Sequence, residues 1–396
     1  MRTVLTAEKL WNGTSLVDHP VVEIEDGRIA SVYSRAMREL TTGARGEVLD
    51  FPGATLAPAF LDVHTHGAAG HDVMEATPEA LKTMGGFLAA HGTGSFLATT
   101  VTAPLDATLR ALSGLAKLLK KSADGMGACA RPVGIHLEGP FLSHAKRGVH
   151  PPEFLLDPDI AVFDRLFEAA EGHIRLMTLA PELPGAEEFT RHATARGVRV
   201  SVGHSNATAV ETQAVIAAGA VSATHTYNAM RPLDHQEPGI LGTVLTTDAL
   251  YAELICDGIH NKPAMVKLWW RAKGPERAIL ITDAMSATGM PDGTYQLGEF
   301  AVQVAKGRAT ANGVLAGSVL TLDKALTNFM EFTGSGLEQA LRLLTTNPAT
   351  MAGLTEEAGR IDAGRAANLV AVDGAGRLVA AIYDGRPVAK TAGSLS

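Results

Sequence analysis

The sequence predicts an α/β protein in which a (β/α)₈ barrel of the TIM type carries a small β-sandwich domain. Short apolar runs alternate with longer amphipathic stretches through the middle of the chain, turn signals mark both ends, and 396 residues exceed the length of one ordinary domain. We therefore assign residues 54–354 to the barrel, and residues 1–53 together with residues 355–396 to the sandwich.

Both ends of the chain have the pattern of β-structure. Near the N-terminus, apolar runs at 21–24 and 29–33 flank an Asp-Gly pair, which is a strong hairpin signal. Near the C-terminus, runs at 368–372 and 378–383 flank a Gly-rich turn. Each run is too short to bury a face alone. We expect the two ends to combine into one small sheet domain.

The middle of the chain contains eight apolar runs that we expect to be strands, with helices between most of them. The strands are expected at 56–63, 95–101, 133–137, 174–179, 198–202, 221–224, 251–256 and 278–282, and helices at 78–91, 105–121, 159–171 and 263–273. A barrel gives this alternation, and so does a doubly wound open sheet. The Gly-rich segment 292–316 is expected to be an insertion with strands of its own.

Bulk composition narrows the functional classes. A formal net charge of -8 argues mildly against a nucleic-acid partner. Two cysteines are too few for a disulfide framework, which favours a reducing compartment. The chain has no apolar stretch of about 18 residues to span a membrane, and its start lacks the pattern of a signal peptide. We expect a cytoplasmic protein that acts on a small molecule.

Five of the eight predicted strands end in residue types that bind divalent metals or move protons. Barrel active sites lie at the C-terminal ends of the strands, and residues two apart in a strand point to the same side. A shared site therefore explains this set better than separate polar caps do. Its members are His64, His66, Glu138, His204, His225 and Asp283.

The residue types indicate the metal chemistry. Imidazole and carboxylate ligands suit Zn²⁺ or Fe²⁺, whereas Mg²⁺ and Ca²⁺ prefer oxygen. Five ligands exceed the need of one tetrahedral ion that retains a water, so Glu138 could bridge two; the sequence allows one or two ions per subunit. Asp283 is the candidate to take a proton from metal-activated water and give it to a departing amine. It could also be a further ligand.

These motifs resemble those of the N-acetylglucosamine-6-phosphate deacetylases, a family within the amidohydrolase superfamily. The matching segments, in chain order, are DVHTHG, HLEGPFLSHAKRGVH, VGHSNAT, THTYNAM, EPGILG, DGIH, TDAMSATG, LAGSVLTLD and GRIDAGRAANLVAVD. The resemblance covers essentially the whole chain. It implies hydrolysis of N-acetyl-D-glucosamine 6-phosphate to D-glucosamine 6-phosphate and acetate, and it implies a homodimer.

The resemblance also assigns roles to individual residues. It implies that Glu138, His204 and His225 are the principal metal ligands, that His64 and His66 allow a second ion, and that Asp283 is the catalytic aspartate. The substrate contacts that it implies are His150, Asn228, Ala229, Gln236, His260 and, in the LAGSVLTLD segment, Ala316.

One position departs from the family pattern. Gln236 stands before the EPG motif, where many members carry an arginine that reaches the substrate phosphate and is thought to come from the partner subunit. Glutamine has no charge and loses the bidentate pair, which predicts roughly tenfold weaker phosphate binding or more. Either Arg231 or His235 compensates, or the substrate is unphosphorylated or a different N-acyl sugar.

Two other functional classes are compatible with histidines and carboxylates at the ends of barrel strands. An amidohydrolase acting on cyclic amides or N-acyl amino acids would use similar metals, but those enzymes often bridge them with a lysine where this chain has Glu138. A non-catalytic relative would keep the barrel as a scaffold and is expected to lose ligands. This chain retains the whole set.

Overall fold

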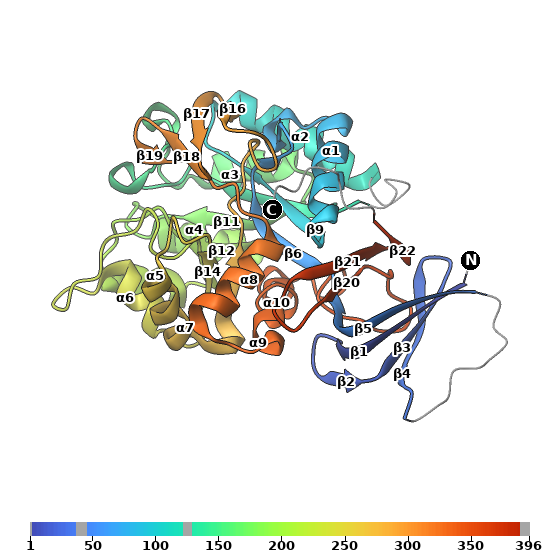
Figure 1. Cartoon of the computed structure of the whole chain (residues 1–396). Helices are drawn as coiled ribbons and strands as arrows, with labels where there is room; N and C mark the ends of the chain where they lie inside the picture. Colours follow the sequence, from blue (N-terminus) through green and yellow to red (C-terminus); the bar gives the residue numbers. More distant parts are fainter. Residues whose placement is uncertain (1, 37–45, 122–128, 389–396) are drawn as a thin grey trace.

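Residues 2–36, 46–121 and 129–388 are described by the structure, a computed structural model in which eight parallel strands form a barrel (Figure 1). Each strand pairs with the next along the chain. The strands are β6 (Phe60–Thr65), β9 (Thr93–Thr100), β10 (Arg131–Glu138), β11 (Ile174–Leu179), β12 (Arg199–Val202), β13 (Ser222–Ala223), β14 (Tyr251–Ile255) and β15 (Ala278–Ile281).

The barrel closes between its first and last strands. A parallel bridge joins Thr65 to Ala284, and the backbone N–H of Asp283 donates to the carbonyl of His64 at 2.9 Å. The predicted barrel is therefore confirmed, and the open doubly wound sheet is excluded.

Helices cover the outside of the barrel and pack on a large apolar cluster. Local sequence explains where they begin: Thr77 accepts from the N–H of Ala80 with Pro78 in the first helical position, and Thr208 forms a capping box with Glu211. The helices are α1 (Pro78–Ala90), α2 (Leu105–Lys121), α3 (Ile160–Ala169), α4 (Ala186–Ala195), α5 (Ala209–Ala217), α6 (Gly239–Thr246), α7 (Pro263–Arg277), α8 (Leu322–Thr333), α9 (Leu337–Arg342) and α10 (Thr346–Ala352). None of the helices in the described residues is long and apolar enough to cross a membrane.

The two ends of the chain form one sheet, as expected from their turns. It buries its own apolar cluster, to which Leu5, Leu56, Leu369 and Ile382 contribute. In spatial order the strands are β22 (Arg386–Pro387), β21 (Leu378–Tyr383), β20 (Leu369–Val372), β5 (Glu47–Pro58), β1 (Arg2–Trp11), β3 (Pro20–Glu25) and β4 (Arg28–Ser34), with β2 (Leu16–Asp18) beside β1.

The prediction that the first barrel strand begins at residue 56 is wrong. Leu56 and Pro58 belong to β5 and pair with β20, and the barrel strand begins at Phe60. The sequence shows one uninterrupted apolar run because the same extended segment passes directly from one sheet into the other. Pro58 has no N–H to extend a ladder, and the N–H of Phe60 already donates to Gly92 in the barrel at 2.9 Å.

The predicted insertion after the last barrel strand is a four-stranded antiparallel sheet (orange in Figure 1). It consists of β16 (Gly293–Leu297), β17 (Phe300–Ala305), β18 (Arg308–Ala311) and β19 (Val314–Leu315). A small apolar cluster that includes Met285 and Leu297 holds it against the segment that follows β15. The insertion therefore stands over one end of the barrel.

Candidate metal centre

The structure brings the six predicted metal and proton-transfer residues together at one end of the barrel. His64 and His66 lie on β6, and Glu138 is the last residue of β10. The other three each follow a strand by two residues: His204 after β12, His225 after β13 and Asp283 after β15. All six residues are buried.

Three of these residues have a backbone conformation that is rare outside glycine. The φ angles of His204, His225 and Asp283 are 46°, 26° and 51°. A non-glycine residue in this region costs roughly 1–3 kcal/mol and persists where the surroundings enforce it, which happens most often at functional sites. Each of these residues follows its strand by two positions, and its side chain meets the others of the set there.

We call Glu138, His204 and His225 the Glu138 group. Glu138 Oε1 lies 3.3 Å from His204 Nε2 and 3.1 Å from His225 Nε2, and the two imidazole nitrogens are 3.0 Å apart. These ligand atoms come from three different strand ends.

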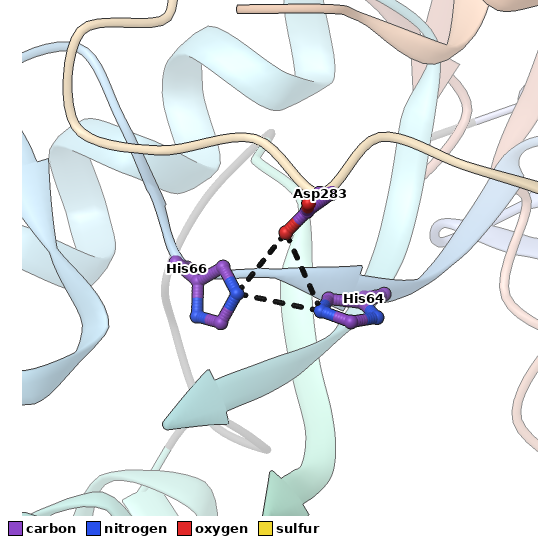
Figure 2. A group of neighbouring side chains, drawn as sticks. All are labelled: His64, His66 and Asp283. Carbon is purple, nitrogen blue, oxygen red and sulfur yellow. Dashed lines mark hydrogen bonds and ion pairs between the residues drawn. The ribbon is translucent and has the colours of Figure 1, made fainter. Parts of the chain in front are cut away.

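We call His64, His66 and Asp283 the His64 group (Figure 2). Asp283 Oδ1 lies 3.4 Å from His64 Nε2 and 3.2 Å from His66 Nε2, and the two imidazole nitrogens are 3.3 Å apart. Glu138 joins the two groups, because its Oε2 atom lies 3.2 Å from His66 Nε2 while its Oε1 atom faces His204 and His225.

Both groups fit a small divalent cation. A tetrahedral zinc ion with ligands at ~2.0–2.1 Å separates them from one another by about 3.3 Å. The six ligand-to-ligand distances within the two groups run from 3.0 to 3.4 Å. The chemistry of the set, imidazole with carboxylate, is also that of zinc or ferrous iron.

The hydrogen bonds of the Nδ1 atoms show which nitrogen of each imidazole is available to an ion. Nδ1 of His66 donates to the carbonyl of Thr99 at 3.1 Å, and Nδ1 of His204 donates to the carbonyl of Lys146 at 2.9 Å. A carbonyl can only accept, so the proton of each neutral ring lies on Nδ1. The Nε2 lone pairs then face the shared centre.

The carboxylates stay ionised in this buried setting. Burial raises the pKa of Glu138, but the imidazoles of His64, His204 and His225, when they are protonated, outweigh it and hold that pKa well below its ordinary value. Burial also raises the pKa of Asp283, but the imidazoles of His66 and His64, when they are protonated, outweigh it, so the pKa of Asp283 is lowered. Two buried charges of one sign call for cations close by.

The centre opens into a cavity of about 300 Å³. One part of its lining holds the polar residues His150, Asn228 and His260, which with Ala229 are the four lining residues predicted to contact substrate. Another part is apolar and is formed by Val149 with Leu297, Val314 and Leu315, three of which belong to the inserted sheet. Among the described residues, no lysine or arginine lines this cavity.

The other two predicted substrate residues lie elsewhere. Gln236 is exposed in the loop before α6, where its backbone N–H donates to Asp234 Oδ1 at 2.8 Å. Ala316 is fully buried in the apolar cluster of the inserted sheet, and its N–H donates to Ala309 at 3.1 Å. Its neighbours Leu315 and Gly317 line the cavity instead. A substrate contact for either residue stays a prediction.

Two buried carboxylates beside the centre were not found from the sequence. Asp62 accepts from the N–H of His64 at 3.2 Å and from the hydroxyl of Thr282 at 2.6 Å. Glu253 lies in the middle of β14 with Oε2 3.4 Å from His64 Nδ1. Each stands as one charged residue in an otherwise apolar run, which is a usable signal that a partner is buried nearby.

Comparison with known proteins finds relatives that cover nearly the whole chain. The model of the amidohydrolase family matches residues 55–393. N-acetylgalactosamine-6-phosphate deacetylase of Escherichia coli O157:H7 is 38% identical over 94% of this chain and 96% of its own length. N-acetylglucosamine-6-phosphate deacetylase of Lysinibacillus sphaericus is 38% identical over 89% of each chain. A mutant N-acetyl-D-glucosamine-6-phosphate deacetylase from Mycobacterium smegmatis, solved with N-acetyl-D-glucosamine-6-phosphate, superposes with a TM-score of 0.89 at 35% identity, covering 98% of this chain and 99% of the other.

Proposed function

We propose that this chain hydrolyses the N-acetyl group of N-acetyl-D-glucosamine 6-phosphate. The reason is its family, because the chain belongs to the amidohydrolases and, among them, to the N-acetylglucosamine-6-phosphate deacetylases. The products are D-glucosamine 6-phosphate and acetate. The observation that carries the proposal is the pair of ligand groups joined by Glu138 at the floor of a cavity with polar and apolar walls.

We assign the two groups to two divalent ions, zinc by preference and ferrous iron as the alternative. Bound there, the ions supply a Lewis acid that activates water and polarises the amide carbonyl. Glu138 would serve both positions, since its carboxylate contacts His204 and His225 of one group and His64 and His66 of the other.

Asp283 is the proton carrier of the proposed reaction. Its side chain is 12% exposed, more than the other five ligands, and it lines the cavity. It takes the proton of the attacking water as the C–O bond forms, and it delivers that proton to the sugar nitrogen as the C–N bond breaks. The carboxylate is ionised again when acetate and the free amine leave.

His150 is positioned to donate a hydrogen bond to the acyl oxygen. The N–H of Thr102 donates to His150 Nδ1 at 3.4 Å, so the proton of the neutral ring lies on Nε2, which is 3.7 Å from Glu138 Oε2. Burial, and to a smaller extent the neighbouring imidazole of His204 when it is protonated, lowers the pKa of His150 to about 3. The ring is therefore neutral at physiological pH and acts as a hydrogen-bond donor.

We assign the sugar phosphate to Asn228, Ala229 and His260 on the polar wall. His260 Nδ1 lies 2.7 Å from Asp257 Oδ2, which fixes the ring in place. Because no lysine or arginine of the described residues lines the cavity, full phosphate binding requires a cation from elsewhere, and Arg231 and His235 remain the candidates in the chain.

Steady-state kinetics of the zinc-loaded protein on four substrates test the proposal. These are N-acetylglucosamine and N-acetylgalactosamine, each with and without the 6-phosphate. The relative from Escherichia coli O157:H7 makes the galacto epimer the second candidate. We expect kcat/KM to be highest for N-acetylglucosamine 6-phosphate. Equal rates with the unphosphorylated sugar would contradict the proposal and give Gln236 the role of marking a changed substrate.

A homodimer and a cytoplasmic location stay predictions. Size-exclusion chromatography with light scattering gives the mass of the protein in solution. We expect a mass near twice that of the 41.4 kDa chain. A single-chain mass would contradict the dimer.

A further inference from the structure

Glu253 is a fully buried carboxylate that the proposed reaction does not use. We propose that it is a positioning residue for the His64 group: it holds the proton of His64 on Nδ1 and thereby raises the affinity of that group for its ion. The inference rests on the proposed metal centre and names a residue that controls one of its two halves.

The contacts of Glu253 place it directly behind His64. Its Oε2 atom lies 3.4 Å from His64 Nδ1 and accepts the backbone N–H of His225 at 3.4 Å. Its Oε1 atom has no partner among the described residues. The side chain is 0% exposed, and a buried carboxylate with so few partners is costly unless it accepts a hydrogen bond from a nearby side chain. The imidazole of His64 is the group within reach.

The position of this carboxylate decides which nitrogen of His64 is free. A carboxylate can only accept, so the single proton of a neutral imidazole goes to Nδ1. The lone pair on Nε2 then faces Asp283 Oδ1 and Glu138 Oε1, both at 3.4 Å. With the proton on Nε2 instead, His64 would block the position that an ion needs.

The other ligand histidines lack such a partner in the described part of the chain. His66 and His204 donate from Nδ1 to backbone carbonyls, and Nδ1 of His225 has no partner. A carboxylate behind a ligating imidazole raises its basicity, and losing such a partner typically weakens metal binding about 10–100-fold. The effect of Glu253 should therefore fall on the ion of the His64 group and spare the ion of the Glu138 group.

Titration of the metal-free protein with Co²⁺, followed by absorption and calorimetry, tests the inference without using activity. We expect two sites in the wild-type protein. Glu253→Gln keeps the volume and an acceptor for the N–H of His225 but removes the charge, and Glu253→Leu removes both. We expect one site to weaken by about 10-fold in the Gln variant and further in the Leu variant, with the second site unchanged. Glu23→Gln, at a buried carboxylate of the terminal sheet, is the matched control and should leave both sites intact.

A double-mutant comparison separates positioning from general damage. In a His64→Ala background, one site is already lost, and Glu253→Gln should leave the remaining site unchanged. A further loss there, or two wild-type affinities in Glu253→Leu, overturns the inference. If the Gln and Leu variants do not fold, Glu253→Asp replaces them, because it keeps the charge but withdraws it from His64 Nδ1. We then expect the same weakening of one site, with the second site unchanged. Because the titration uses no substrate, a wrong substrate assignment would show in the kinetics and leave this result unaffected.

Discussion

The Glu138 group and the His64 group have the same ligand spacing but are built differently. The Glu138 group takes its three ligands from three strand ends, and two of them stand in left-handed backbone. The His64 group takes two ligands from the single strand β6 and the third from the segment after β15. The first group therefore requires the register of half the barrel, whereas the second requires only the seam where the barrel closes.

The surroundings of the two groups differ as well. A backbone carbonyl lies behind each group, that of Lys146 behind His204 and that of Thr99 behind His66. Behind the His64 group lie two buried carboxylates, Asp62 and Glu253. Asp62 also accepts from Thr282, the residue before Asp283, and so ties β6 to the segment after β15. The comparison shows how one shared carboxylate can join two sites, of which the first depends on the register of half the barrel and the second depends on individual side chains around it.

The largest expected effect comes from the residue that the two groups share. Glu138→Gln replaces one oxygen of the carboxylate that contacts imidazoles of both groups by an amide nitrogen that cannot bind a cation. We expect loss of both ions and turnover at background. Elemental analysis of the purified variant measures the ions. One ion retained at wild-type affinity would mean that the groups are independent.

Asp283→Asn tests the proton carrier within the His64 group. General acid–base catalysis contributes about 10²- to 10⁴-fold, and we expect kcat to fall by that amount or more. The Glu138 group is unaltered, so at least one ion per chain should remain. An Asn variant with wild-type turnover would remove Asp283 from its role.

His204→Ala and His64→Ala form a matched pair, since each removes one imidazole from one group. Each variant should bind one ion fewer than the wild-type protein. We expect His64→Ala to retain measurable turnover, because Asp283 stays beside an occupied Glu138 group, and His204→Ala to retain none. Equal residual rates in the two variants would show that the groups contribute alike.

The smallest effect is expected outside both groups. Gln236→Arg adds a guanidinium that can pair with a phosphate, which we expect to raise kcat/KM for the phosphorylated sugar by about tenfold. Gln236→Ala serves as the control for loss of the amide. A gain of equal size on the unphosphorylated sugar would show that the arginine acts by some route other than the phosphate.

The sequence predicted the ligands of the His64 group and those of the Glu138 group by different routes. Strand alternation alone placed His64 and His66 on one side, whereas Glu138, His204 and His225 could be joined only through the family resemblance or by assuming that the strands form a barrel. The left-handed turns that aim His204 and His225 had no signal, since neither position is a glycine. Ala316 sits in the right segment, but its side chain turns into an apolar cluster, a direction that local sequence does not reveal.

Anomalous diffraction from crystals grown with zinc, recorded on both sides of the zinc absorption edge, tests the central claim most directly. The account predicts two peaks per chain, one among Glu138, His204 and His225 and one among His64, His66 and Asp283, with Glu138 between them. A single peak, or a peak outside these two groups, would contradict it.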